Sequence, residues 1–543
     1  MTMEQHVYPN RVHIINFIRG AEPRLPIDLL EALREQLALI RKHQLKATWL
    51  IQYDALIDAK FTELLKRETN EAQEIGAWFE VVQPMTEKAG IPWRGRYSWD
   101  WHAHVGFSIG YTPQERERLA DVFMEEFKRQ FGYYPQSVGS WFMDAHLLAY
   151  LSDRYGIQAS CNCKDQWGTD GYTLWGGYYN QAYYPSRLNG FMPAQTAENQ
   201  IPVPVFRMLG SDPIYQYDAA DHGDGQCVVT LEPVYTGTGG GGGIPAWVRW
   251  FFDVNFRPSQ LTFGYAQVGQ ENSFGWKRIK EGLTDQVELL VQKQAEGVLV
   301  VETLAETGKW FKQQYPLTPA SAICALTDWK DEGRQSLWYY NRNYRINFLR
   351  QDGNIRIRDI HMFDECYEER YLREVCTTEN CRYDTLPVID GSRWSDEYTQ
   401  AGIYPVIFDE AGNAARITVK ALETDETVAG ELSIVLHMEG EGDVIKIRCS
   451  DEAVTFQSEL INWGLMMEWG NTQEQPGLET VSKGEIALCF HGHRYAASIT
   501  GCESLEMNRS ESNSSALDST EIRPANWIKL RSACKEISLK LCR

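Results

Sequence analysis

The sequence predicts an α/β fold, an incomplete (β/α)7-type barrel followed by a C-terminal antiparallel β-sandwich. Short apolar segments alternate with amphipathic helical segments up to about residue 318, which is typical of a parallel sheet covered by helices. Carboxylates follow successive apolar segments, as they do at the mouth of a barrel. Beyond Pro319 the helical periodicity fades and short alternating segments take over. We therefore expect a barrel domain at 1–318 and a β-sandwich accessory domain at 319–543.

The predicted parallel strands are short apolar segments that end close to an ionisable residue. They lie at 12–17, 47–52, 75–82, 137–142, 157–163, 205–209 and 261–268, with a last strand at 298–301. Helices are expected between them, and the clearest begins at the capping box Thr112-Pro113-Gln114-Glu115 and ends before Gly132. An open doubly wound sheet shows the same alternation and is the alternative fold.

The positions of the carboxylates favour the barrel, because its strand ends all converge on one mouth. Each of the following residues comes after a different predicted strand: Glu22, Asp54, Glu80, Asp144, Asp165, Asp212 and Glu271. The competing explanation is that acidic residues cap the helices that follow the strands. Helix capping explains any one of these residues more easily than it explains the whole set.

The second half carries the pattern of an antiparallel β-sandwich. Its alternating segments lie at 337–348, 355–360, 416–421, 430–438, 444–449 and 485–490. Turn dipeptides such as Asp352-Gly353 and Glu439-Gly440 separate neighbouring segments.

Charge and composition exclude several classes of partner. Lys and Arg number 53 against 74 Asp and Glu, and a net charge of −21 argues against nucleic acid and anionic membranes. No apolar run is long enough to span a membrane, and the N-terminus has no leader pattern. As written, the chain is expected to be cytoplasmic; it would be periplasmic or secreted if a leader has been removed. The 12 cysteines include no CxxC pair, so we expect reduced structural cysteines.

The aromatic content favours a carbohydrate partner. The chain has 18 Trp and 27 Tyr, whose flat faces stack on sugar C–H surfaces while their polar groups bond hydroxyls. A large core is the alternative use for these rings. An oligosaccharide or polysaccharide substrate is therefore expected.

The stretch 74–104 concentrates residues suited to chemistry. An apolar strand ends near Glu80, and a tryptophan-rich loop follows it. The aromatic and ionisable residues of this loop are Trp93, Arg94, Arg96, Trp99, Asp100, Trp101, His102 and His104. No amphipathic helix fits this loop, and a carboxylate at a strand tip followed by such a loop is typical of a barrel pocket.

Three segments resemble the glycoside hydrolase/deacetylase superfamily: ATWLIQYDAL, EIGAWFE and SVGSWFMDAHLLAYLSDRYGI. The likeness covers roughly residues 10 to 315, and it looks nearest to bacterial glycoside-hydrolase-like members. It implies an incomplete (β/α)7 barrel, in some members with an added β-domain, that acts on carbohydrate.

The metal ligands of polysaccharide deacetylases in that superfamily are missing from the matching positions. Their Asp-Asp pair after strand one corresponds here to Ile18-Arg19, and their His-x-x-x-His after strand three corresponds to 80–84, Glu-Val-Val-Gln-Pro. We expect no metal cofactor at those positions. The alternative is a divalent metal held by His102 and His104 with Asp100 or Asp144.

The main functional hypothesis is glycoside hydrolysis by two carboxylates, one as acid and one as nucleophile or base. The candidates are Glu80, flanked by aromatic residues that could raise its pKa, and Glu271, which lies among hydrogen-bonding and stacking groups. Asp144 and Asp212 are the reserves. Which carboxylate is the acid stays open.

The substrate-binding candidates are aromatic and ionisable residues near predicted strand tips. They are Arg19, Glu22, Trp78, Arg94, Trp99, Asp100, His102, His104, Trp141, His146, Trp175, Asn272 and Trp276. The arginines could bind a carboxylate or sulfate on the glycan. The alternative functions are a metal-dependent polysaccharide deacetylase and a non-catalytic carbohydrate-binding homologue.

Overall fold

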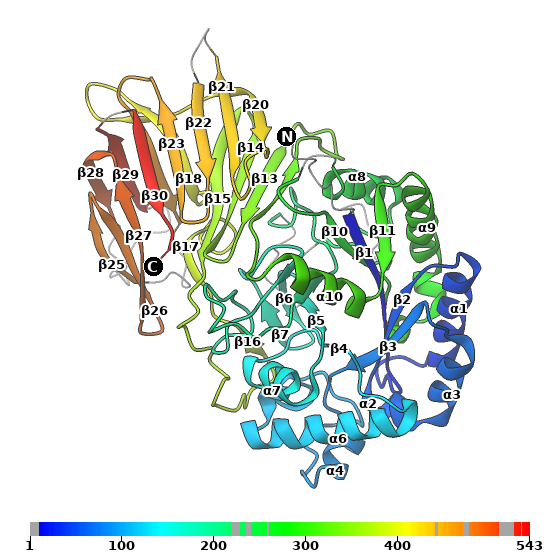
Figure 1. Cartoon of the computed structure of the whole chain (residues 1–543). Coiled ribbons are helices and arrows are strands. Elements are labelled where there is room, and N and C mark those ends of the chain that lie inside the picture. Colours follow the sequence, from blue (N-terminus) through cyan, green and yellow to red (C-terminus); the bar gives the residue numbers. More distant parts are fainter. Residues whose placement is uncertain are drawn as a thin grey trace.

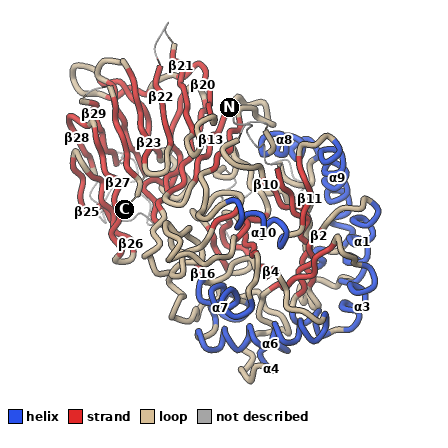
Figure 2. The backbone as a smooth tube through the Cα atoms, viewed as in Figure 1, coloured by secondary structure: helices blue, strands red, loops and turns tan. Residues whose placement is uncertain are grey.

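The protein has a helix-covered half and a half made of strands, which lie side by side (Figures 1 and 2). The computed structural model describes residues 10–218, 229–234, 240–257, 260–439, 444–470, 477–509, 526–533 and 535–542, without the side chains of 167–169. Within these ranges no helix is long and apolar enough to cross a membrane.

The first half is built on one curled sheet whose parallel strands run in the order β10-β1-β2-β3-β4-β5-β9. These strands are β1 (Asn10–Ile18), β2 (Ala47–Ile51), β3 (Gln73–Trp78), β4 (Ser137–Gly139), β5 (Ala159–Cys163), β9 (Val205–Met208) and β10 (Tyr265–Val268). The two-residue strand β8 (Ala182–Tyr183) runs antiparallel beside β9, and β11 (Leu299–Glu302) pairs with the start of β1. Every predicted strand is present.

The barrel stays open between β9 and β10, which share no strand pairing in the described ranges. A side chain bridges the gap: Leu209 N donates to Gln267 Oε1 at 2.9 Å. The predicted incomplete (β/α)7-type barrel is therefore confirmed.

Helices cover the outside of the sheet (Figure 1). The long ones are α1 (Leu29–Lys42), α3 (Ala59–Glu68), α6 (Pro113–Phe131), α7 (Ala145–Tyr155), α8 (Pro245–Asn255) and α9 (Trp276–Ala295). A further helix, α10 (Leu304–Gln314), lies at the N-terminal ends of the strands, and its Leu304 and Phe311 join the cluster inside the barrel. The predicted capping box of α6 is present, and Gly132 ends the helix at φ 85°. The predictions did not include α8, which lies in the insertion after β9.

Short helices break the loops after β2 and β3. They are α2 (Tyr53–Ile57), α4 (Gln83–Lys88) and α5 (Ala103–Gly106), with the 3-10 turn Ser108–Gly110. A second 3-10 turn, Asn272–Phe274, lies in the loop after β10. The single turn α5 lies at the end of the tryptophan-rich loop and contains His104, and in agreement with the expectation no amphipathic helix runs through residues 93–102, all of which are described.

The second half is an antiparallel β-sandwich, as predicted. One sheet contains β12 (Ser321–Ala325), β13 (Gln335–Tyr340), β14 (Tyr344–Gln351), β15 (Asn354–Met362), β17 (Leu386–Asp390), β18 (Gly402–Phe408), β19 (Ala414–Arg416), β24 (Trp463–Trp469), β28 (Cys502–Asn508) and β29 (Asn526–Ser532). The other contains β20 (Val419–Asp425), β21 (Leu432–Met438), β22 (Val444–Cys449), β23 (Ala453–Ser458), β25 (Gly477–Ser482), β26 (Glu485–Phe490), β27 (His493–Thr500) and β30 (Glu536–Lys540).

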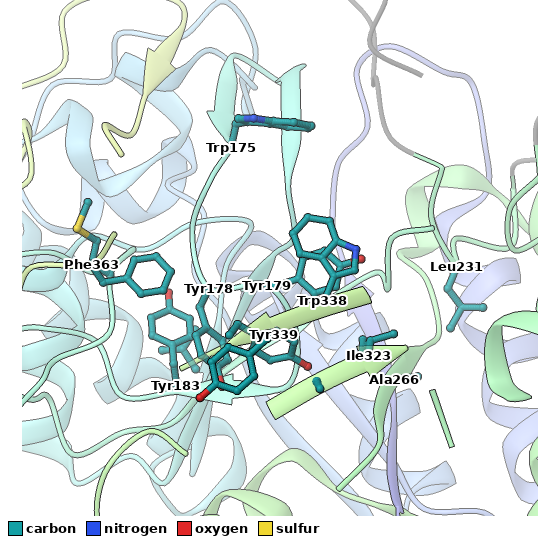
Figure 3. Close-up of a cluster of buried hydrophobic side chains, with 14 of the residues drawn as sticks. Trp175, Tyr178, Tyr179, Tyr183, Leu231, Ala266, Ile323, Trp338, Tyr339 and Phe363 are labelled. Atoms are coloured by element: carbon teal, nitrogen blue, oxygen red, sulfur yellow. The ribbon is translucent and has the colours of Figure 1, made fainter. Parts of the chain in front are cut away.

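Buried aromatic rings, some of which Figure 3 shows, and buried charges join the two halves. Tyr179 stacks on Trp338 of β13, with ring centroids 3.7 Å apart. Arg345 of β14 donates to Asp165, which follows β5, at 2.8 Å, and also to Asp359. Both ends of the Arg345–Asp165 ion pair are fully buried, so the pair is shielded from water between the two halves.

A crossing segment, residues 372–382, leaves the second half and packs against the barrel loops. Cys376 N donates to Ile109 O, Ala103 N donates to Glu379 O, and Cys381 N donates to Gly171 O. Its strand β16 (Cys381–Arg382) joins β7 (Tyr172–Leu174) and β6 (Gln166–Thr169) in a small sheet. The segment thereby fixes the β6–β7 turn.

Gly171 in that turn should not tolerate a side chain. Its φ is +71°, and a Cβ would overlap the carbonyl oxygen of Glu379. Gly90 is the matched control, since it has φ +69° and open space around the added Cβ. We expect Gly90→Ala to cost about 1 kcal/mol of unfolding free energy and Gly171→Ala about 1–3 kcal/mol more, because the chain must shift. Urea unfolding gives the free energy lost in each variant. Equal losses in Gly171→Ala and Gly90→Ala would contradict the prediction.

Candidate active site

A pocket of about 320 Å³ opens at the C-terminal ends of the barrel strands. The residues that line it are Glu22, Arg24, Leu25, Trp141, Gln166, Asp170, Tyr172, Leu209, Glu232, Glu271, Ser273, Phe274 and Arg278. They come from the loops after β1, β4, β5, β9 and β10, together with the first turn of α9. This is the face at which barrel enzymes carry their active sites.

The side chain of Arg19 lies directly behind the pocket and gathers carboxylates around it. Its Nη2 is 3.0 Å from Glu80 Oε1 and 3.3 Å from Glu271 Oε2, and its Nη1 is 3.9 Å from Glu22. The Trp99 ring lies 4.0 Å from the guanidinium carbon. Arg19 is 0% exposed, so its charge is balanced inside the protein and not by water.

The loop after β1 holds Arg19 in place through its backbone. Arg19 N donates to Asn272 Oδ1 at 2.9 Å, and Asn272 Nδ2 returns a bond to Arg19 O at 3.0 Å. Gly20 N donates to Asp54 Oδ1 at 3.0 Å. Asn272 and Asp54 therefore orient the loop that places the guanidinium between Glu80 and Glu271.

Glu271 faces the pocket, whereas Glu80 lies behind it. Glu271 lines the cavity, binds Arg19, and accepts a hydrogen bond from Ser273 Oγ. Glu80 is 1% exposed, and its Oε2 accepts a bond from Gln52 Nε2 at 2.7 Å. The predicted pair thus shares one guanidinium, and only its Glu271 member can touch a bound ligand.

Burial raises the pKa of both carboxyl groups. It raises the pKa of Glu80 to about 7, opposed by Arg19 and reinforced by the negative charge of Glu271. Burial also raises the pKa of Glu271, opposed by Arg19 and Ser273. Because one guanidinium serves two carboxylates, Glu80 is expected to hold a proton part of the time near neutral pH.

The titration of Glu80 predicts a pH-dependent stability. With a folded pKa of about 7, above its unfolded value, Glu80 contributes stability that is present below about pH 4.5 and lost as pH rises through 7. Glutamine is neutral at every pH, so Glu80→Gln does not lose this stability. Its unfolding free energy relative to that of the wild type should rise by roughly 3 kcal/mol from pH 4.5 to pH 8. Unfolding free energies at both pH values measure this. Glu281→Gln, an exposed change on α9, is the control and should keep the same difference from the wild type at both pH values. A difference in unfolding free energy between Glu80→Gln and the wild type that does not change with pH would contradict the prediction.

The two reserve carboxylates lie outside the pocket and are engaged by neighbouring groups. Asp144 caps α7, where it accepts from Leu147 N, and pairs with buried Arg116 at 3.0 Å. Asp212 accepts from the backbone of Ile214 in a turn and from Trp247 Nε1. The capping explanation therefore holds for Asp144, and Asp212 is bound by a turn and a tryptophan.

Several predicted binding residues lie in the core and cannot touch a ligand. Trp78 is fully buried inside the barrel, against Phe17 and Trp141. Trp175 donates Nε1 to Asp390 in the second half. Trp276 lies half-buried at the start of α9 and does not line the pocket. By contrast, Trp141 lines the pocket, as predicted.

The ionisable residues of the loop after β3 bind neighbouring protein groups. Arg94 donates to Gly110 O. Asp100 pairs with Arg96 at 2.8 Å, and its pKa is lowered to about 2 because hydrogen bonds to Arg96 and the charge of Arg96 outweigh its burial. These two arginines therefore have partners already, as does Arg19, and are poorly placed to bind an anionic glycan.

The three predicted histidines also lie away from the pocket. His102 approaches Glu379, and His104 Nδ1 lies 3.1 Å from Thr378 O, so both contact the crossing segment. His146 lies 3.1 Å from Glu117 on the surface of α6. The alternative metal site of His102 and His104 with Asp100 or Asp144 is not formed among the described residues, since Asp100 is bound to Arg96 and Asp144 to Arg116.

The divalent metal of polysaccharide deacetylases does not fit these residues. A guanidinium follows β1 at Arg19, and Glu80 after β3 is bound to it. The pocket lining includes no histidine among the described residues, and no group of three or more His, Cys, Asp or Glu in those ranges is arranged to hold an ion. We derive no chemical step through a metal.

The structure adds pocket residues that sequence reasoning missed. Arg24 pairs with Glu22 and with Asp170, each at 2.8 Å, and so ties the β1 loop to the β6–β7 turn. Glu232 comes from the insertion after β9. The alternation of strands and helices gives no signal for Asp170 or Glu232, because both residues lie in long segments without a periodic pattern.

Comparisons with known proteins return a resemblance in structure only. No protein family matches the sequence, and no curated protein does. A protein described as a glycoside hydrolase/deacetylase from Parabacteroides distasonis matches over 69% of this chain and 88% of its own, at 17% identity and TM-score 0.48. Polysaccharide deacetylase structures from Mycobacterium smegmatis and Pseudomonas aeruginosa match over 56% of this chain and 90% and 92% of theirs, at 12% and 10% identity and TM-score 0.35 each. The strand order described above, and not these matches, establishes the fold.

Proposed function

We propose that the protein is a carbohydrate-active hydrolase that cleaves a glycosidic bond in this pocket. The observation that carries the proposal is the position of Glu271, a carboxylate on the pocket wall held by Arg19 and Ser273. The side chains of Trp141 and Tyr172 line the same cavity, and aromatic side chains suit contact with a sugar ring. The volume is at the small end for ligand pockets, which suits one terminal sugar of a chain.

Each group near Glu271 has a part in the proposed reaction. Glu271 acts on the anomeric carbon, either directly as the nucleophile or through a water molecule as the base. Arg19 favours its ionised form against the effect of burial and orients it, and Ser273 fixes one of its oxygens. Glu80 shares Arg19 from behind, so its protonation state sets how much of the positive charge Glu271 receives. In the resting protein Glu80 is a positioning residue, since it does not line the pocket.

A panel of substrates tests the proposal. The purified protein is assayed on aryl glycosides and oligosaccharides for release of the phenol and of reducing sugar, and on acetylated glycans for release of acetate. Glycoside cleavage supports the proposal. Acetate release without cleavage favours the deacetylase alternative, and sugar binding without turnover, measured by calorimetry, favours a binding protein; either result would overturn glycoside hydrolysis.

A further inference from the structure

The tryptophan-rich loop after β3 carries a ring that two arginines share. The guanidinium carbon of Arg19 lies 4.0 Å from the centroid of the Trp99 ring, and that of Arg24 lies 4.7 Å from it. Trp99 is 1% exposed and is not part of the pocket lining, so it cannot stack on a bound sugar. An indole face attracts cations, and the attraction is strongest where water is excluded.

The backbone around Trp99 is fixed by the loop itself. Trp99 forms an isolated antiparallel bridge with Val82, just after the end of β3. Beside it, the Asp100 carboxylate accepts from Arg96 N at 2.9 Å and from His102 N at 3.1 Å. These bonds close the loop and give the ring a defined place against the two arginines.

The two guanidiniums are like charges that lie close together, and two groups hold them there. The first is Glu22, whose Oε2 lies 2.8 Å from Arg24 Nη2 and 3.9 Å from Arg19 Nη1. The second is the ring of Trp99, because it attracts both cations. One carboxylate and one ring therefore offset the repulsion between the arginines.

The position of the two guanidiniums affects the charge of Glu271. Burial raises the pKa of Glu271, and the charge of Arg19 opposes that rise. The hydrogen bond from Ser273 and the charge of Arg24 oppose it too, whereas the charge of Asp170 reinforces it. Displacing either guanidinium would therefore make Glu271 harder to ionise. The other charged groups of the site are Glu22, Glu80, Glu232 and Arg278.

We infer that Trp99 is a positioning residue of the proposed reaction, whose ring holds Arg19 and Arg24 beside the pocket carboxylates. The inference rests on the proposed function. It gives the tryptophan-rich loop a part in the site, although the ionisable residues of that loop bind neighbouring protein groups. Removing the ring should loosen both arginines, and Glu271 should then ionise only at higher pH.

The acidic limb of the pH–rate profile tests this role. In Trp99→Leu the limb of kcat/KM should move to higher pH by about 1 unit, because the cations balance Glu271 less well. At pH values below the limb kcat/KM should therefore fall about 10-fold, with a smaller loss on the plateau. Trp99→Phe keeps an aromatic face and should bring the limb most of the way back. A ring that only filled space would change the rate without moving the limb.

Trp310→Leu is the matched control. The centroid of the Trp310 ring also lies close to a guanidinium, that of Arg11, at 3.4 Å. Arg11 lies at the start of β1, at the opposite end of the strands from the pocket. Trp310→Leu should therefore leave the acidic limb where the wild type has it.

Urea unfolding at pH 5 and pH 7.5 gives a second readout that needs no substrate. Trp99→Leu should lose more unfolding free energy relative to the wild type at pH 7.5, where the buried carboxylates depend most on their cations. Trp310→Leu should lose the same amount at both pH values.

The outcomes separate this inference from the proposed function. A wild-type protein that cleaves no glycoside overturns the proposed function, and the unfolding measurements then decide alone whether Trp99 holds the guanidiniums. With an active wild type, an unmoved acidic limb in Trp99→Leu, or an equal loss of stability at both pH values, overturns the role of Trp99 alone. If Trp99→Leu does not fold, Trp99→Phe replaces it: its limb should move in the same direction by a smaller step, and an unmoved limb overturns the inference.

Discussion

Glu271→Gln should abolish most glycoside cleavage while leaving the fold intact. A loss of about 1,000-fold in kcat is expected, because the amide cannot act as nucleophile or base. Folding should survive, since the glutamine oxygen can still accept bonds from Arg19 and Ser273, which now hold the carboxylate. Initial rates on the best substrate of the panel, with melting temperatures alongside, measure both effects.

Added azide distinguishes the two possible roles of Glu271. If Glu271 is the nucleophile, azide should restore turnover of Glu271→Gln and yield a glycosyl azide of inverted stereochemistry. If Glu271 is the base for water, the wild-type product should itself be inverted. The exposed change Glu281→Gln again serves as the control. Full activity in Glu271→Gln would remove this residue from the mechanism and, with it, the main support for the proposed function.

Arg19→Leu should be the most destabilising single change in the site. It leaves Glu80 and Glu271 buried without their shared partner, and breaking a buried ion pair typically costs about 3–5 kcal/mol. Without the guanidinium both carboxyl groups should take up protons more readily. The variant should therefore recover part of its stability at acid pH, where the two groups are neutral.

Urea unfolding at pH 5 and pH 7.5 measures the effect of Arg19→Leu. The loss of unfolding free energy relative to the wild type should be larger at pH 7.5 than at pH 5. Arg41→Leu is the matched control, because Arg41 pairs with Glu68 but its side chain is 61% exposed, and such a pair contributes about 1 kcal/mol or less. Arg19→Leu could also lose as little unfolding free energy as Arg41→Leu, or lose the same amount at both pH values. Either result would contradict the conclusion that the Arg19 guanidinium balances the two buried carboxylates.

The sequence was sufficient to predict the architecture because local periodicity encodes it. Apolar runs of strand length, and helices with caps such as that at Thr112, recur along the first half regardless of what they pack against. The same reasoning placed Glu80 and Glu271 at strand ends, and a parallel barrel brings such ends together. It could not show that Arg19 lies between them, since that depends on the course of a loop.

Several other site assignments do not fit the structure, because a partner distant in sequence engages the residue. Asp144 was a reserve acid, yet Arg116 and the start of α7 engage it. His104 was a binding candidate, yet it faces Thr378 of the crossing segment. Glu232 gave no signal, because what fixes it is Gln286, a glutamine on the inward face of α9. Such pairings are set by tertiary packing, which neither composition nor spacing reveals.

The crossing segment has a consequence for the inheritance of this protein. The turn that presents Asp170 to the pocket is bonded to Cys381, a residue of the sandwich half. A recombination event that exchanged the C-terminal half for an unrelated sandwich would remove one wall of the barrel's own site. The two halves should therefore descend together, with changes near Gly171 matched by changes near Glu379. Among homologues, paired substitution at these two places would record that shared ancestry.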